Sequence, residues 1–120
     1  MRLLITAEGK DLDANVDPRF GRAAYFLVVD MEKGEIVEVV DNGAGREAAQ
    51  GAGVQAAQTA ARLQVEALVT GHCGPKAFNA MSAAGVKVFT GASGTVRQAL
   101  AQYQENQLTE ARGADVRGHW

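Results

Sequence analysis

The sequence contains one cysteine, Cys73, among 120 residues. A single cysteine excludes an internal disulfide, a CxxC redox pair, a zinc knuckle and a four-thiolate iron–sulfur site within one chain. Aromatic residues make up only 6% of the chain, and many apolar positions are alanine. Because such a core is built from small side chains, its helices and strands must approach one another closely.

Long apolar runs and an excess of positive charge are also lacking. The N-terminal stretch MRLLITAEGKDLD becomes acidic after a few apolar residues, too early for a secretory h-region or a membrane span. Lysine and arginine number 12 against 14 acidic residues, and the formal net charge is −2. This balance provides no general attraction to nucleic acid or to an anionic membrane. We therefore expect a cytoplasmic protein with neither partner.

The length and composition predict a single domain. The chain is 47% hydrophobic and 22% charged, as is usual for globular proteins. Strands are predicted for five short apolar or β-rich runs, at residues 2–7, 25–30, 36–40, 65–70 and 86–90. A polar loop containing Gly34 separates the second run from the third, which predicts an antiparallel hairpin.

Three helices are predicted between and after these strands. The first is an Ala- and Gln-rich segment ending near Gln64, in which small residues recur at helical spacing. The second is bracketed by Pro75 and Gly85, and the third has the inner face Val96, Ala99, Leu100 and Tyr103. The chain thus predicts an α/β fold with a mixed five-stranded sheet, which starts as a hairpin and continues as parallel βα units. We expect residues 1–108 to form one cofactor-binding domain and residues 109–120 to be a flexible tail.

If the first, fourth and fifth strands are parallel, the loops that begin at Glu8, Gly71 and Gly91 meet at one edge of the sheet. This edge is the usual ligand site of an open α/β sheet. Two of the loops are glycine-rich and lead into helix N-termini, whose N–H groups and positive dipole favour an anion. The candidate binding residues share these loops or carry positive charge there: Arg19, Arg22, Gly71, His72, Cys73, Gly74, Lys76 and Gly94.

Plainer interpretations stay open for several of these residues. Arg19 and Arg22 could instead form a local salt bridge with Asp13 or Asp17. Gly71 and Gly74 could simply shape a tight turn, and Asp41 and Asn42 are most simply turn residues.

Cys73 and His72 are the candidate metal ligands. A lone cysteine is more often an inert, half-buried residue than a ligand. However, a thiol beside a histidine at a helix N-terminus should have more thiolate character than a core cysteine.

Catalytic motifs are scarce in the sequence. It contains no GxSxG string, no suggestively spaced Ser-His-Asp set and no P-loop lysine. The first strand carries no central acid, which disfavours a two-metal nuclease. We therefore expect a binding protein and not an enzyme, although the same edge would also suit a phosphate-containing substrate.

Three segments carry a family resemblance: the DPRFGRA string at residues 17–23, QGAG at residues 50–53 and GHCGPKAF at residues 71–78. Together they resemble the dinitrogenase iron–molybdenum cofactor biosynthesis family, and most closely its free-standing orange protein type. This resemblance implies a ribonuclease H-like fold that binds a preformed metal–sulfur cluster without catalysis. It further implies a molybdenum-containing sulfide cluster with copper or iron, held non-covalently or through weak ligation. The matching loop residues are Arg19, Arg22, Gly71, Gly74 and Gly94, whereas His72 and Cys73 lie where members of the family vary.

Two functional hypotheses follow from these observations. The first is a metal carrier that exchanges a cluster with donor or acceptor proteins or with an ATPase. The second is an interaction module that docks to an ATPase or assembly partner without a bound cluster. Either function suits a monomer or a weak dimer.

Overall fold

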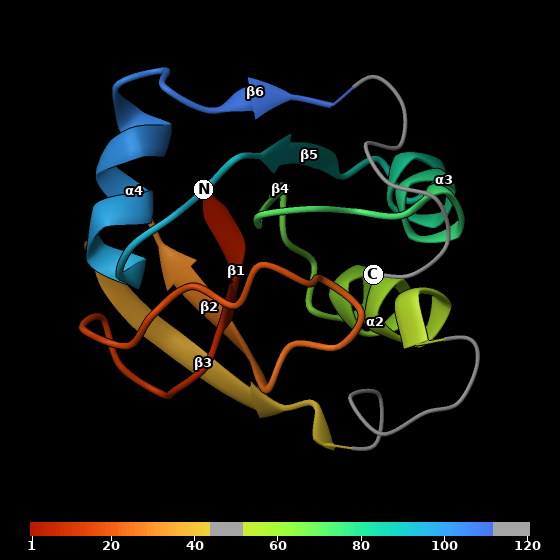
Figure 1. Ribbon diagram of the computed structural model, residues 1–120, viewed down its shortest axis with the longest axis horizontal. Helices are drawn as coiled ribbons and strands as arrows, with labels where there is room; N and C mark the ends of the chain where they lie inside the picture. The colour runs from red at the N-terminus through yellow and green to blue at the C-terminus, as the bar shows by residue number, and fades with distance from the viewer. Residues whose placement is uncertain (44–51, 112–120) are drawn as a thin grey trace.

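The computed structural model describes residues 1–43 and 52–111. In this part of the chain, a mixed sheet of six strands has the order β3-β2-β1-β4-β5-β6 (Figure 1). The strands are β1 (Arg2–Ala7), β2 (Tyr25–Asp30), β3 (Glu35–Asp41), β4 (Ala67–Val69), β5 (Lys87–Thr90) and β6 (Thr109–Glu110).

The pairing of the strands confirms the predicted mixed sheet. β1 pairs antiparallel with β2, and β2 pairs antiparallel with β3, so the first three strands form a meander. β1 is parallel to β4, and β4 is parallel to β5. The carboxyl ends of these three parallel strands therefore lie at one edge of the sheet, as the sequence predicted.

The predicted number of five strands was wrong by one. Thr109 and Glu110, the first residues of the predicted tail, pair antiparallel with Thr90 and Phe89 as β6. A hydrogen bond from the Ala111 N–H to the Val88 carbonyl, 2.7 Å long, continues this pairing. A strand of two residues is too short to show an alternating pattern in the sequence. The rest of the predicted tail, residues 112–120, lies outside the described residues.

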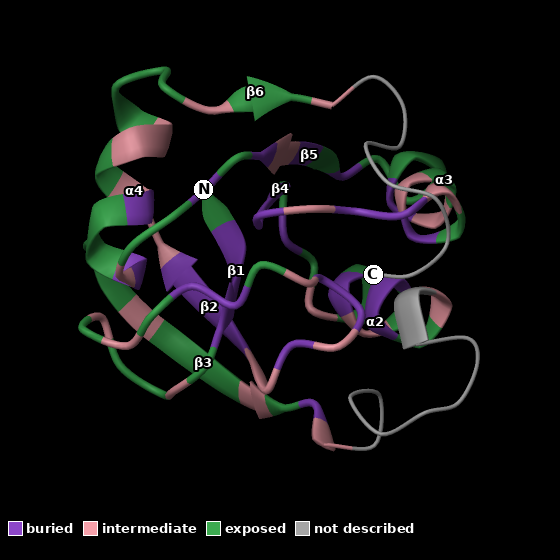
Figure 2. Cartoon of the chain, viewed as in Figure 1, coloured by how far each residue is buried: buried purple, intermediate pink, exposed green. Residues whose placement is uncertain are grey.

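Three helices within the described residues cover the two faces of the sheet: α2 (Ala52–Arg62), α3 (Pro75–Ala83) and α4 (Val96–Gln104). α2 and α3 lie on one face and α4 lies on the other (Figure 1). Alternate residues of β1 point to opposite faces, so Leu4 joins the α2 and α3 side whereas Leu3 and Ile5 join the α4 side. The result is a three-layer arrangement in which β1 is buried and β3 is largely exposed (Figure 2).

Small side chains allow the close packing of α2 that the sequence predicted. Ala56 and Ala60 are fully buried, and Ala57 is nearly so. α3 begins at Pro75, and Gly85 follows its end with a φ of +77°, as the sequence predicted from this proline and glycine. Part of the predicted first helix, including Gln50 and Gly51 of the QGAG string, lies outside the described residues. None of the described helices has the length and hydropathy needed to cross a membrane.

Candidate functional site

Three loops meet where β1, β4 and β5 end. We call them the first loop (residues 8–24), the Gly71 turn (residues 70–74) and the Gly91 turn (residues 91–95). The Gly71 and Gly91 turns are joined by a hydrogen bond of 3.1 Å from the Gly91 N–H to the Gly71 carbonyl. Asn15 of the first loop forms an isolated bridge with Thr95. The structure thus brings together the loops on which every predicted site residue except Lys76 lies.

Gly71 is the point of closest approach between the first loop and the Gly71 turn. A Cβ at this position would lie 2.7 Å from the Pro18 Cα and 2.9 Å from the Pro18 carbonyl oxygen. The contact allows the His72 N–H to donate to the same Pro18 oxygen at 2.7 Å. Arg19 and His72 then run side by side as a parallel bridge. Gly71 is therefore required for the close packing of the first loop against the Gly71 turn.

Two buried hydroxyl groups join β1, β4 and the first loop. The Thr6 hydroxyl donates to the Asp17 carbonyl at 2.6 Å and lies 2.8 Å from the Thr70 hydroxyl. Because a hydroxyl has one proton and Thr6 donates its own to Asp17, Thr70 must be the donor to Thr6. Both threonines are fully buried. This chain of hydrogen bonds fixes the base of the site, and nothing in the sequence had singled out either residue.

Asp17 is the buried acid of the first loop. Its side chain is 2% exposed, and Oδ1 lies 3.7 Å from the Arg19 Nε. The same carboxylate accepts hydrogen bonds from the Arg19 N–H at 3.2 Å and the Ala24 N–H at 3.3 Å. Of the two acids weighed as partners for the arginines, Asp17 pairs with Arg19, whereas Asp13 pairs with Arg97 at 3.2 Å. The Arg19 side chain remains 38% exposed, so the ion pair orients its guanidinium group without burying it.

Asn42 closes the other end of the first loop. Its side-chain amide donates to the carbonyls of Gly21 at 3.2 Å and Ala23 at 2.9 Å, and its own N–H donates to the Ala24 carbonyl at 2.9 Å. The sequence indicated only a turn residue at this position. The partners lie about twenty residues earlier in the chain, so no local pattern could have revealed them.

The N-terminus of α4 is occupied by the protein itself. Its Val96 and Arg97 N–H groups donate to the carbonyls of Ala14 and Leu12 in the first loop. Thr95 and Gln98 form a reciprocal capping box that satisfies each other's backbone N–H groups. Gly94 has a φ of +81°, and its carbonyl accepts from the Val16 N–H at 2.8 Å. The Gly94 turn thus holds the first loop against α4. The first four N–H groups at this end already have partners within the protein and leave no room for an anion: those of Thr95, Val96, Arg97 and Gln98.

The N-terminus of α3 is different because its N-cap residue makes no side-chain cap hydrogen bond. Gly74 is the N-cap residue and has no side chain to offer, and Pro75 follows at the first helical position. Lys76, in the first turn, is exposed. The backbone N–H groups at a helix N-terminus and the positive end of the helix dipole favour an anion. This helix end lies directly after His72 and therefore close to Arg19.

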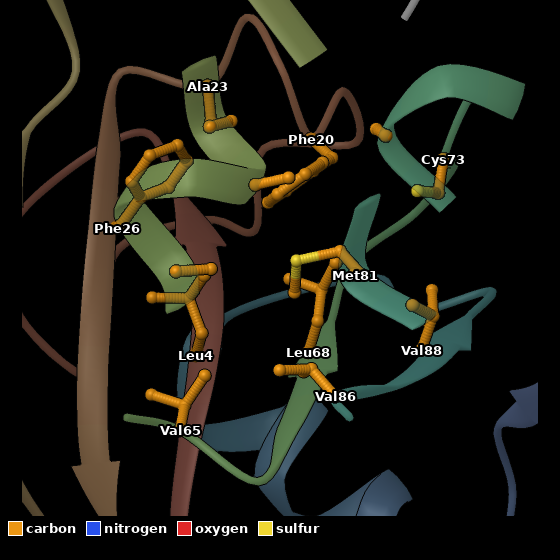
Figure 3. Packing of buried hydrophobic residues seen from close by; sticks show 14 of the residues in the cluster. Leu4, Phe20, Ala23, Phe26, Val65, Leu68, Cys73, Met81, Val86 and Val88 are labelled. Carbon is orange, nitrogen blue, oxygen red and sulfur yellow. The ribbon is translucent and has the colours of Figure 1, made fainter. Parts of the chain in front are cut away.

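Cys73 is buried, and its thiol belongs to the core. The residue is 1% exposed and lies among the side chains that pack between the sheet and α3, including Phe20 and Met81 (Figure 3). Its sulfur is 3.8 Å from the Gly74 carbonyl oxygen. His72 is only partly buried. Because Cys73 is 1% exposed, its sulfur is not accessible to a cluster in this conformation.

The described residues contain no group of three or more His, Cys, Asp or Glu side chains arranged to hold a metal ion. This edge offers instead the positively charged side chains of Arg19 and Lys76 and the N-terminus of α3. Such a site suits an anionic ligand whose metals already carry their own ligands.

Comparison with known proteins shows the family of this chain. The family model described as dinitrogenase iron–molybdenum cofactor matches residues 1–106. The chain belongs to this family. The uncharacterized protein MJ0580 of Methanocaldococcus jannaschii is 30% identical over 95 residues, which cover 78% of this chain and 80% of the relative.

Solved structures extend the similarity to the whole fold. The apo form of the orange protein from Desulfovibrio gigas is 47% identical, covers 96% of both chains and superposes with a TM-score of 0.91. A Thermotoga protein of the DUF35 family is 39% identical, and the match covers 91% of both chains with a TM-score of 0.78. These similarities confirm the predicted family and its link to the orange protein type.

Proposed function

We propose that this protein is a non-catalytic carrier of an anionic, molybdenum-containing sulfide cluster, with copper or iron as the second metal. The cluster would bind where Arg19, His72 and the N-terminus of α3 adjoin. The observation that carries the proposal is the uncapped N-terminus of α3, which lies beside the Arg19–His72 bridge at the carboxyl edge of the sheet. Membership of the cofactor family and similarity to the orange protein support a cluster as the anion.

The chemistry of the site suits a cluster that arrives preformed. Sulfide bridges already occupy most metal positions in such a cluster, so the protein needs to supply charge and hydrogen bonds and few metal ligands. Arg19 offers a guanidinium group held by Asp17, and Lys76 offers an exposed ammonium group on the first turn of α3. Backbone N–H groups at the start of α3 add further donors.

The test is reconstitution of the apo-protein with tetrathiomolybdate, with and without a copper salt. Gel filtration, visible absorption and metal analysis then report whether colour stays with the protein at a fixed metal-to-protein ratio. Arg19→Ala and Lys76→Ala should each weaken retention about tenfold, because each removes a charge-assisted contact. Arg62→Ala and Lys87→Ala are the matched controls, since both side chains are exposed and lie at the opposite edge of the sheet.

Cys73→Ser separates a charge-based site from a thiolate-based one. If charge and backbone donors bind the cluster, the serine variant retains colour, because the thiol is buried in the core. Loss of colour with an intact fold would make Cys73 a metal ligand and would require the Gly71 turn to open. Colourless wild-type protein under every condition, or equal losses in the control variants, would contradict the proposed site.

A second candidate function, docking to an ATPase or assembly partner, is favoured by β3, the outermost strand on its side of the sheet formed by residues 1–43 and 52–111. This strand is seven residues long and lies at the end of the sheet. Val37 and Val39 are 40% and 41% exposed, and Glu35, Glu38 and Asp41 make the strand acidic. Like charges would oppose each other if two copies paired through this edge, so a basic partner segment fits it better.

Docking through β3 is tested by a pull-down with the candidate partner. Glu38→Lys should reduce capture, whereas Arg19→Ala should leave it unchanged. The opposite pattern would place the partner at the cluster site and would remove β3 from consideration.

A further inference from the structure

Asn42 makes three hydrogen bonds to the end of the first loop. It directly follows β3 and is 8% exposed. Its Nδ2 lies 3.2 Å from the Gly21 carbonyl oxygen and 2.9 Å from the Ala23 carbonyl oxygen. These two carbonyls flank Arg22 in the sequence, so one amide group holds the backbone on both sides of this arginine.

An amide is suited to this position because a single nitrogen must donate twice. The primary amide of asparagine carries two N–H donors, serine would supply one, and an ionised aspartate would supply none. A carboxylate would also place negative charge against two carbonyl oxygens. The side chain at position 42 is therefore matched to the pair of carbonyls around Arg22 and not merely to a turn.

The neighbouring peptide group is held from both sides as well. The Ala24 N–H donates to the Asp17 carboxylate at 3.3 Å, and the Ala24 carbonyl accepts from the Asn42 N–H at 2.9 Å. Asp17 also orients Arg19 through its ion pair. The backbone that carries Arg22 is thus connected to the buried acid at one end and to Asn42 at the other.

We propose that Asn42 is a positioning residue that sets the Arg22 guanidinium group for binding of the anionic ligand. This inference rests on the proposed function for its ligand and goes beyond it in assigning a role to a residue distant in sequence. Ordering a long arginine side chain on binding costs entropy, and a backbone that is already held lowers this cost. Asn42 itself need not touch the ligand.

The first test is a pair of double-mutant cycles measured by titration with tetrathiomolybdate. Asn42→Leu keeps the shape of the side chain and removes both donors. We expect Asn42→Leu and Arg22→Ala each to weaken binding about tenfold, and the double variant to be weakened about tenfold as well. Asn42→Leu combined with Lys76→Ala should instead show the product of the two single losses. Multiplicative losses in the Arg22 cycle would overturn the proposal, because they would mean that Asn42 acts independently of Arg22.

The second test uses the apo-protein and needs no ligand. Nitrogen-15 relaxation of the arginine Nε groups reports side-chain order, and Arg97, whose Nε lies 3.2 Å from the Asp13 Oδ1, is the internal control. We expect Asn42→Leu to lower the order of the Arg22 Nε and to leave the Arg97 Nε unchanged. Asn42→Ser, which retains one donor, is the second variant should the leucine variant fail to fold.

The two tests separate the inference from the proposed function. If wild-type protein does not bind tetrathiomolybdate, the proposed function fails, and the relaxation data still decide whether Asn42 orders Arg22. If the cluster binds and Arg22 order is unchanged in the Asn42 variants, the positioning role is overturned while the carrier function stands.

Discussion

Replacing Gly71 with alanine tests the closest contact in the site. Gly71 is buried, and an added Cβ would meet the Pro18 backbone at 2.7 Å and 2.9 Å. Such distances are shorter than real Cβ contacts, and the neighbouring atoms are backbone, which cannot rotate away. The first loop must therefore move away from the Gly71 turn, and the hydrogen bond from the His72 N–H to the Pro18 carbonyl must lengthen or break.

The size of the effect follows from these two changes. Overpacking of a well-packed position costs about 1–3 kcal/mol, and loss of one hydrogen bond costs about 1 kcal/mol. The free energy of unfolding should fall by about 2–4 kcal/mol, which corresponds to a decrease in Tm of roughly 8–16 °C for a chain of this length. Retention of the cluster should also fall, because the first loop and the Gly71 turn form the site together.

Gly85→Ala is the matched control in the same assay. Gly85 has a φ of +77°, and an added Cβ would meet nothing within 4 Å, so only backbone strain of about 1 kcal/mol is expected. Thermal unfolding of both variants is followed by far-ultraviolet circular dichroism. If Gly71→Ala lowers Tm no more than Gly85→Ala does, the steric reasoning is refuted. A normal Tm with lost cluster retention would instead show that the loop moves at little cost.

Three further changes test the supports of the site. Thr95→Ala removes the capping box of α4 and should lower the free energy of unfolding by about 1 kcal/mol in urea denaturation. An unchanged denaturation midpoint would mean that the capping box does not stabilise the fold. Asp17→Asn keeps the shape but removes the charge that pairs with Arg19, and should cost about 1–3 kcal/mol by the same assay. The backbone N–H of Lys33 lowers the pKa of Asp30, so the ionised form stabilises the fold at neutral pH and this contribution is lost as pH falls through the lowered pKa. Asp30→Asn should therefore reduce the dependence of the free energy of unfolding on pH at acidic pH. If carbon-13 NMR shows that Asp30 titrates above its ordinary pKa, this reasoning is refuted.

The sequence was sufficient for the elements with a strong local pattern. The apolar runs at residues 2–7 and 25–30 became β1 and β2 with the predicted bounds, and the helix bracketed by Pro75 and Gly85 became α3. Burial of a strand or a helix face imposes a period on the side chains, and this period can be read without knowledge of the fold. The family motifs added which loops face the site.

Other parts of the site depended on contacts between distant residues. The sequence suggested that the N-terminus of α4 could bind an anion. In the structure, carbonyl groups of the first loop, about eighty residues earlier in the chain, accept the hydrogen bonds of its N–H groups. Cys73 lay in a turn at a helix N-terminus, and only packing against the core showed that its thiol is buried.

The sequence by itself determined the mixed α/β class, the parallel edge and the family, because these depend on periodicity and on short motifs. Only the tertiary structure decided that β6 extends the sheet at its edge and that Asn42 holds the backbone around Arg22. It also decided that the N-cap residue of α3, unlike that of α4, makes no side-chain cap hydrogen bond. The physical reason is that a hydrogen bond depends on position in space, and the pairing of β2 with β3 brings Asn42 beside Gly21 and Ala23, about twenty residues earlier in the chain.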